Sequence, residues 1–238
     1  MNENTQSPIE EILESIKKKL LAIFKDNLKS LILYGSWAKG TAKSDSDVDL
    51  LVVLGEMNEN ARKKIYDIES EIDINRSISI VPVSIKDFKS EKLPLYTAVK
   101  KEGRIIYGEV DLSINPVTEK VKYADFFKRS HKFESDKIKT AEELLDKNLT
   151  SGIAEFCFIA SKHAIQATLA MEGKGYTSKI SLLMPLARKN MGKDISSTFQ
   201  KLFNLYLKAE YEMEFLTDDE AKLAIKYAKK IMDVYNRY

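Results

Sequence analysis

The sequence predicts an α/β domain followed by an all-α helical bundle, and three observations lead to this fold class. Short apolar runs alternate with helical patterns over the first half of the chain, which is typical of an α/β domain. Long amphipathic patterns with almost no strand signal fill the second half, which favours a helical bundle. Pro116, in an Asn-Pro pair that favours a turn, lies close to the change of pattern. We therefore expect one domain at residues 1–112 and a second at residues 113–238.

The elements of the first domain follow from periodicity and punctuation. Ser7, Pro8 and Glu10 have the order of an N-cap, a first-turn proline and a capping box, and apolar residues then recur at helical spacing as far as residue 23. Residues 58–71 also have a helical pattern. Apolar runs bounded by turn-forming residues predict four strands, at residues 30–34, 48–54, 78–84 and 104–107. Pro82 cannot donate a ladder hydrogen bond, so we expect its position to face out of the sheet.

The second domain is predicted to hold three or four long helices. One apolar stripe runs through residues 153–171, and Gly173 and Gly175 interrupt the chain after it. Thr217 and Glu220 have the spacing of a capping box ahead of the last apolar stripe. These features predict a helical bundle.

Composition excludes several classes of protein. The 238 residues are 44% hydrophobic and 31% charged, as in ordinary globular proteins. A net charge of +2 argues against a protein built mainly to coat nucleic acid or an anionic membrane. Cys157 is the single cysteine and there are two histidines, which excludes an internal disulfide and a Cys/His zinc cluster. The N-terminus has no basic start followed by an apolar run, and no stretch has membrane-spanning length, so we expect a cytoplasmic protein.

Two aspartates lead into the second predicted strand. Residues i and i+2 of a strand point to the same face, so Asp47 and Asp49 are expected to project together while Val48 and Leu50 face the core. Two adjacent carboxylates repel each other unless a cation lies between them. Mg²⁺ suits this position, because it prefers oxygen ligands and commonly takes one or two carboxylates along with water and substrate phosphate.

A glycine and a serine end the first predicted strand. Gly35 permits a sharp turn and a close approach of a ligand to the backbone, and Ser36 offers a hydroxyl and an N–H group. A helix that begins there would direct further N–H donors at an anion. Lys39 and Lys43 are either phosphate contacts or surface charges, and Trp37 either stacks on a base or packs against the protein. Together with the aspartates, this pattern indicates a site for a metal-bound nucleoside triphosphate.

The stretch from Gly35 to Leu50 resembles the signature of the minimal nucleotidyltransferases of the DNA polymerase β-like superfamily. The matching residues are Gly35, Ser36, Gly40, Ser46, Asp47, Asp49 and Leu50. The resemblance implies a small mixed sheet with flanking helices, ATP or another NTP as substrate, and Mg²⁺ held by Asp47 and Asp49. The second half is similar to the helical HEPN domain, which often accompanies these enzymes.

The sequence departs from both families at functional positions. Family members that transfer nucleotides usually carry a third carboxylate on a neighbouring strand, and here that position falls on Ser79, or on Asp73 if the strand begins earlier. Losing a metal ligand or a base costs several kcal/mol of transition-state stabilisation. HEPN relatives with ribonuclease activity carry an Arg followed by a His after four to six intervening residues, and no Arg precedes His131 or His163 at that distance. Ribonuclease activity of that kind is therefore not expected.

The sequence thus predicts a nucleotidyltransferase that moves an NMP from a Mg²⁺-bound NTP to an acceptor hydroxyl, with Asp47, Asp49 and Asp73 as its catalytic carboxylates and the helical domain selecting the acceptor. The alternative is a weak or inactive nucleotide-binding or antitoxin-like interaction module, because Ser79 stands where the third carboxylate is expected. The acceptor is left open among a small molecule, a protein and an RNA end. Whether the protein is a homo-oligomer is also left open.

Overall fold

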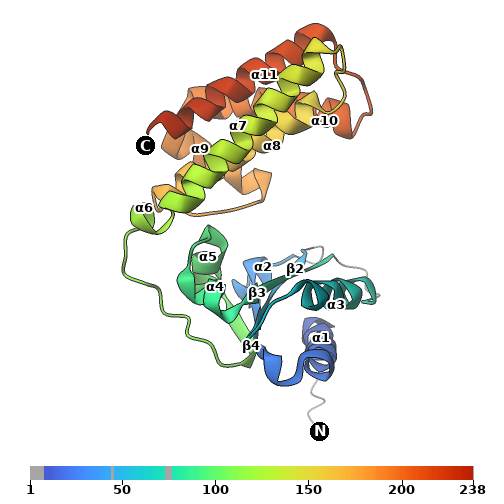
Figure 1. Cartoon of the computed structure of the whole chain (residues 1–238), viewed down its shortest axis with the longest axis vertical. Coiled ribbons are helices and arrows are strands. Elements are labelled where there is room, and N and C mark those ends of the chain that lie inside the picture. Colours follow the sequence, from blue (N-terminus) through green and yellow to red (C-terminus); the bar gives the residue numbers. More distant parts are fainter. Residues whose placement is uncertain (1–7, 44–45, 73–76, 238) are drawn as a thin grey trace. The chain divides into compact units, whose positions relative to one another are not determined.

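A computed structural model describes residues 8–43, 46–72 and 77–237. The chain divides into two compact units, Met1–Pro116 and Val117–Tyr238. The division lies four residues beyond the boundary expected from the sequence. Figure 1 shows the α/β character of the first unit and the helical character of the second.

The first unit is built around a mixed four-stranded sheet. Its strands are β1 (Leu28–Tyr34), β2 (Val48–Leu54), β3 (Ile78–Ser84) and β4 (Arg104–Gly108), in the order β3-β2-β1-β4. Strands β2 and β3 are parallel, and β1 pairs with β2 and β4 in antiparallel fashion. The predicted small mixed sheet is confirmed, although β1 begins two residues earlier than expected. Pro82 lies on the edge strand β3, where its missing N–H disturbs no inner ladder.

Helices cover both faces of this sheet (Figure 1). On one face α1 (Pro8–Phe24) and α3 (Glu59–Ser70) pack against Leu50 and its even-numbered neighbours in β2. On the other, the residues of α4 (Ile85–Ser90) and α5 (Pro94–Glu102) pack against the odd-numbered side chains of β2. The short elements η1 (Lys25–Asn27) and α2 (Gly35–Ala38) precede and follow β1. Helices α4 and α5 are absent from the sequence prediction, and Asp49 belongs by strand alternation to the face that they cover. Ser7, the predicted N-cap of α1, lies outside the described residues.

The strand register brings four chain segments together at one end of the strands, and we call this end the edge of the sheet. Tyr34, the last residue of β1, is opposite Asp49 of β2, and Asp49 is opposite Ser79 of β3. On the other side of β1, Leu33 is opposite Arg104, the first residue of β4. The turn after β1 and the start of β2 therefore lie side by side.

A buried ion pair holds the end of the first unit in place. The Lys100 ammonium lies 2.6 Å from Glu91 Oε1, and the two side chains are 5% and 2% exposed. Glu91 Oε1 also accepts a hydrogen bond from the Asn115 amide (3.0 Å), and Lys100 donates to the Ser113 carbonyl (2.9 Å). Ser113 in turn donates to the Asp111 carboxylate, which lowers the pKa of Asp111. Residues 111–115, which we call the connector, are thus fixed to the first unit.

The second unit is a helical bundle with α8 (Ile153–Met171) at its centre. Both the predicted stripe and most of the opposite side of α8 are buried, Cys157 among them. The capping box of Thr217 and Glu220 is confirmed at the start of α11. The described residues form more long helices than expected, namely α7 (Ala124–Asp146), α8, α9 (Ile180–Met191), α10 (Lys193–Glu210) and α11 (Asp218–Met232), together with the short α6 (Glu119–Lys122) and η2 (Asp233–Arg237). No helix in the described ranges is both long and apolar enough to cross a membrane.

Candidate functional site

The turn after β1 is shaped around the carboxylate of Asp49. Gly35 has a φ of +72°, a left-handed conformation that favours glycine. A Cβ atom at Gly35 would lie 3.2 Å from Asp49 Cγ and would overlap Oδ2. The absence of a side chain at Gly35 is therefore what allows the Asp49 carboxylate to lie against the turn. Asp49 itself is half-buried at the start of β2.

The hydroxyl of Ser36 is buried beside this turn, and no described residue hydrogen-bonds to it. A buried hydroxyl without a partner is costly, so such atoms in native proteins commonly have a ligand, water or functional explanation. Helix α2 has four residues and makes about one turn, so it supplies no long helix dipole at this position.

The other sequence-predicted residues lie close by in the chain but differ in their surroundings. Asp47 immediately precedes β2 and is exposed. Lys39 follows α2, and its ammonium lies 2.6 Å from the Glu102 carboxylate at the end of α5. Lys43 is exposed, and its backbone N–H donates to the Ser46 hydroxyl over 2.9 Å.

The third-carboxylate position has two candidates in the sequence. Ser79 lies directly opposite Asp49 in the parallel β2–β3 ladder, so the two side chains share one face of the sheet. Asp73 lies outside the described residues. Within the part of the chain that the structure describes, no cluster of three or more His, Cys, Asp or Glu side chains could hold a metal ion. The donor set at this edge nevertheless suits Mg²⁺, which completes its coordination with water and phosphate oxygens.

The structure adds two contacts that the sequence did not predict. Glu102 pairs with Lys39, and it was missed because residues 85–102 carried no helix prediction, although Pro94 at the first position of α5 was an available signal. The Trp37 indole N–H donates to the Ser46 carbonyl over 3.1 Å. Its ring packs against the core beneath α1 and α3, which agrees with the packing alternative for Trp37.

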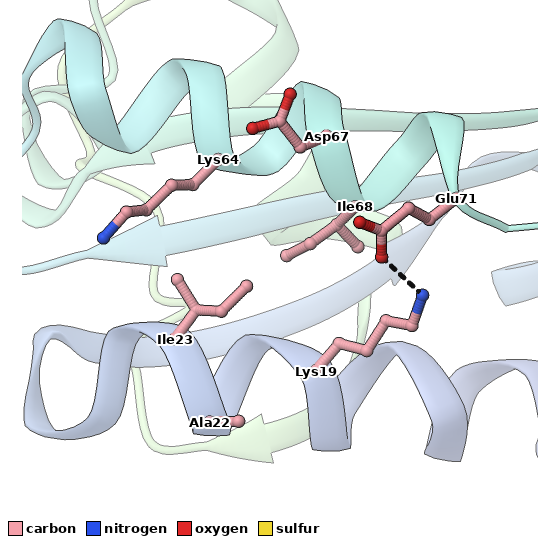
Figure 2. Close-up of a pocket in the computed structure, with 7 residues that line it drawn as sticks. All are labelled: Lys19, Ala22, Ile23, Lys64, Asp67, Ile68 and Glu71. Carbon is pink, nitrogen blue, oxygen red and sulfur yellow. Dashed lines mark hydrogen bonds and ion pairs between the residues drawn. The ribbon is translucent and has the colours of Figure 1, made fainter.

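The groove in Figure 2 lies away from this edge. It has a volume of about 310 Å³ and runs between α1 and α3, where an ion pair of 3.0 Å joins Lys19 to Glu71 beside Ile68. Since Asp49 faces the α4–α5 side, this groove and the aspartate lie on opposite faces of the sheet. We assign it no part in the nucleotide site.

The histidines of the helical unit have structural contacts. The His131 ring stacks on Tyr235 with the centroids 4.7 Å apart. His163 Nδ1 lies 2.8 Å from the carboxylate of Glu134, which also binds Lys137. Each histidine thus has an aromatic or a carboxylate partner within the helical unit.

Comparisons with known proteins agree with the two-part organisation. A family model described as "Polymerase beta, Nucleotidyltransferase" matches residues 17–111, and a model of the HEPN domain matches residues 135–238. Two proteins of Methanocaldococcus jannaschii, both provisionally named protein adenylyltransferases, are similar in sequence. The first is 38% identical over 77 residues, which are 32% of this chain and 78% of that protein. The second is 32% identical over 126 residues, which are 48% of this chain and 83% of that protein.

One solved structure resembles the chain over most of its length. The spectinomycin adenyltransferase AAD(9) from Enterococcus faecialis, solved with ATP and spectinomycin, matches with a TM-score of 0.50 over 94% of this chain and 99% of that one. At 16% identity this likeness shows a shared fold. Together with the sequence relatives and the family models, it shows that the chain belongs to the nucleotidyltransferases of the polymerase β family and carries a HEPN domain after its nucleotidyltransferase domain.

Proposed function

We propose that this protein transfers AMP from Mg²⁺-bound ATP to a hydroxyl group of a protein acceptor. The observation that carries the proposal is the Asp49 carboxylate lying against the side-chain-free turn at Gly35, beside the buried Ser36 hydroxyl, to which none of the described residues hydrogen-bonds. The names of the two sequence relatives favour a protein acceptor over the small molecule and the RNA end that the sequence also left open. The ATP of the spectinomycin enzyme favours adenosine among the nucleotides.

In this proposal each residue at the edge of the sheet has one task. Gly35 lets the triphosphate approach the backbone, and the Ser36 hydroxyl donates a hydrogen bond to a phosphate oxygen. Lys43 supplies positive charge to the phosphates, and Lys39 does so when its ammonium exchanges the Glu102 carboxylate for a phosphate oxygen. Asp47 and Asp49 hold Mg²⁺, which when bound would neutralise phosphate charge and stabilise the leaving pyrophosphate.

The reaction requires an in-line attack on the α-phosphorus. A bond forms from the acceptor oxygen to this phosphorus, the bond to the bridging oxygen breaks, and pyrophosphate leaves with that electron pair. The acceptor hydroxyl gives its proton to a base. Asp73 is the proposed base from the sequence, and the helical domain is proposed to select the acceptor.

Transfer of label from ATP labelled on the α-phosphate tests this function. The protein is incubated with Mg²⁺, labelled ATP and a mixture of proteins, and both labelled protein and released pyrophosphate are measured. We expect label to follow the α-phosphate and not the γ-phosphate, and Asp49→Asn to abolish transfer. Asp67→Asn is the matched control, because Asp67 is an exposed aspartate on the opposite face of the sheet. Transfer by the Asp49→Asn variant at the wild-type rate would refute the site.

A second function, nucleotide binding without transfer, is favoured by one observation. Ser79, whose hydroxyl is neither a base nor a neutralising ligand, lies opposite Asp49. For such an interaction module we expect calorimetry to detect binding of ATP with Mg²⁺ while no pyrophosphate is released with any acceptor. Pyrophosphate release that depends on Asp49 would exclude it.

A further inference from the structure

The single tryptophan of the chain joins two parts of the nucleotide site. Trp37 lies in α2, directly after Gly35 and Ser36. Its indole N–H donates to the backbone carbonyl of Ser46 over 3.1 Å. The ring also packs against the core of the first unit, so both this packing and the hydrogen bond fix the indole in place.

The acceptor of this hydrogen bond is itself fixed. The Ser46 hydroxyl accepts from the Lys43 amide at 2.9 Å, and the Ser46 amide donates to the Lys43 carbonyl at 3.1 Å. The Ser46 carbonyl belongs to the peptide group that leads into Asp47. Trp37 therefore sets the position of the peptide group on which Asp47 is carried, relative to the turn at Gly35.

Asp47, unlike Asp49, lies outside the strand pairing of β2. Strand β2 begins at Val48, whose amide donates to the Ser77 carbonyl over 2.9 Å, and Asp49 is paired on both sides of β2. Asp47 precedes the strand and is exposed. A carboxylate in this situation depends on side-chain contacts of its loop for its orientation.

We infer that Trp37 is a positioning residue, which holds Asp47 in place relative to the Gly35–Ser36 turn so that a divalent cation and a triphosphate can be bound together. This inference rests on the proposed function and adds a residue to that site. Trp37 acts through the Ser46 peptide and need not touch the nucleotide. Loss of its N–H should therefore weaken the contribution of Mg²⁺ to nucleotide binding, rather than nucleotide binding in general.

The variant Trp37→Phe retains an aromatic ring and lacks the N–H donor. We expect the apparent dissociation constant for Mg²⁺, titrated against a fixed concentration of a nonhydrolysable ATP analogue, to rise about fivefold, the effect of one lost hydrogen bond. We expect the affinity for the analogue in EDTA to be unchanged. Tyr235→Phe is the control, since it removes one hydrogen bond to Ser130 in the helical unit. It should leave both constants unchanged.

The outcomes separate this inference from the proposed function. If the wild type binds the analogue with Mg²⁺, Asp49→Asn removes binding, and Trp37→Phe has the wild-type Mg²⁺ constant, the inference alone is wrong. An equal loss with and without Mg²⁺ would mean a packing role and would also overturn it. If the wild type binds no analogue at all, both fail.

The wild-type protein provides a second measurement that does not depend on a variant. Trp37 is the sole source of tryptophan fluorescence. Addition of Mg²⁺ to the protein with the analogue should change the emission, because the peptide that accepts its hydrogen bond leads into a metal ligand. Emission that is the same with Mg²⁺ and with EDTA would overturn the inference.

Discussion

Replacing Gly35 with alanine tests whether the turn is shaped around the Asp49 carboxylate. Two costs add at this position. A residue with a side chain pays about 1–2 kcal/mol for a left-handed backbone, and the Cβ atom would overlap Asp49 Oδ2. Displacing a packed group typically costs about 1–3 kcal/mol more. We therefore expect Gly35→Ala to lower the free energy of unfolding of the first unit by about 2–5 kcal/mol.

The same turn contains a matched control. Gly40 has a φ of +69°, and a Cβ atom there would meet no atom within 4 Å. Gly40→Ala should therefore pay the backbone cost alone, about 1–2 kcal/mol. In an Asp49→Ala background the overlap at Gly35 is gone, so Gly35→Ala should cost no more than Gly40→Ala. The difference between the two backgrounds is the coupling energy of Gly35 and Asp49.

Urea unfolding followed by tryptophan fluorescence measures these energies, because Trp37 reports on the first unit and no other tryptophan is present. Calorimetry with Mg²⁺ and an ATP analogue then measures binding, which Gly35→Ala should reduce far more than Gly40→Ala. Equal destabilisation by the two alanines, or a cost at Gly35 that persists without the Asp49 carboxylate, would refute the reasoning.

Three further experiments probe other parts of the chain. Ser79→Asp adds a carboxylate opposite Asp49, and we expect faster pyrophosphate release with Mg²⁺; a slower or unchanged rate would argue against Ser79 as the third-carboxylate position. Glu91→Gln leaves Lys100 buried without its counter-charge, so the free energy of unfolding should fall by about 3–5 kcal/mol, and adding Lys100→Met should restore part of this loss. If neither variant changes the free energy of unfolding, the ion pair does not stabilise the first unit. Burial raises the pKa of the Cys157 thiol to about 12. Between about pH 7 and 10 we therefore expect iodoacetamide to label this thiol in urea and not in the folded protein, with the label measured by mass spectrometry. Rapid labelling of the folded protein would contradict the burial of Cys157.

The strands could be predicted from the sequence because their signal is local. The runs at residues 48–54 and 78–84 are bounded by polar residues, and the structure has β2 and β3 at those bounds. Helices α4 and α5 could not be found in this way, since they have six and nine residues and carry too few turns for a periodic pattern to stand out. Because α5 was not predicted, Glu102 at its end was not predicted as the partner of Lys39 either.

The composition of the candidate site was predicted better than its contacts. Gly35, Ser36 and Asp49 could be grouped from residue type and spacing, and the structure brings them to one sheet edge. The overlap between a Gly35 Cβ and the Asp49 carboxylate depends on the β1–β2 register, which spacing along the chain does not determine. The same holds for Trp37, whose hydrogen-bond partner lies nine residues away across a turn.

The connector determines where this enzyme could exchange its second domain. Glu91 and Lys100 use the backbone of Asn115 and Ser113 as hydrogen-bond partners, so these residues belong to the nucleotidyltransferase fold although they follow its last strand. A gene fusion that joined a new helical domain directly after β4 would remove one donor from a buried carboxylate and one acceptor from a buried ammonium. Recombination that preserves the nucleotidyltransferase domain must therefore retain the chain through Asn115, and the first position at which a foreign sequence can be joined without that loss is Pro116.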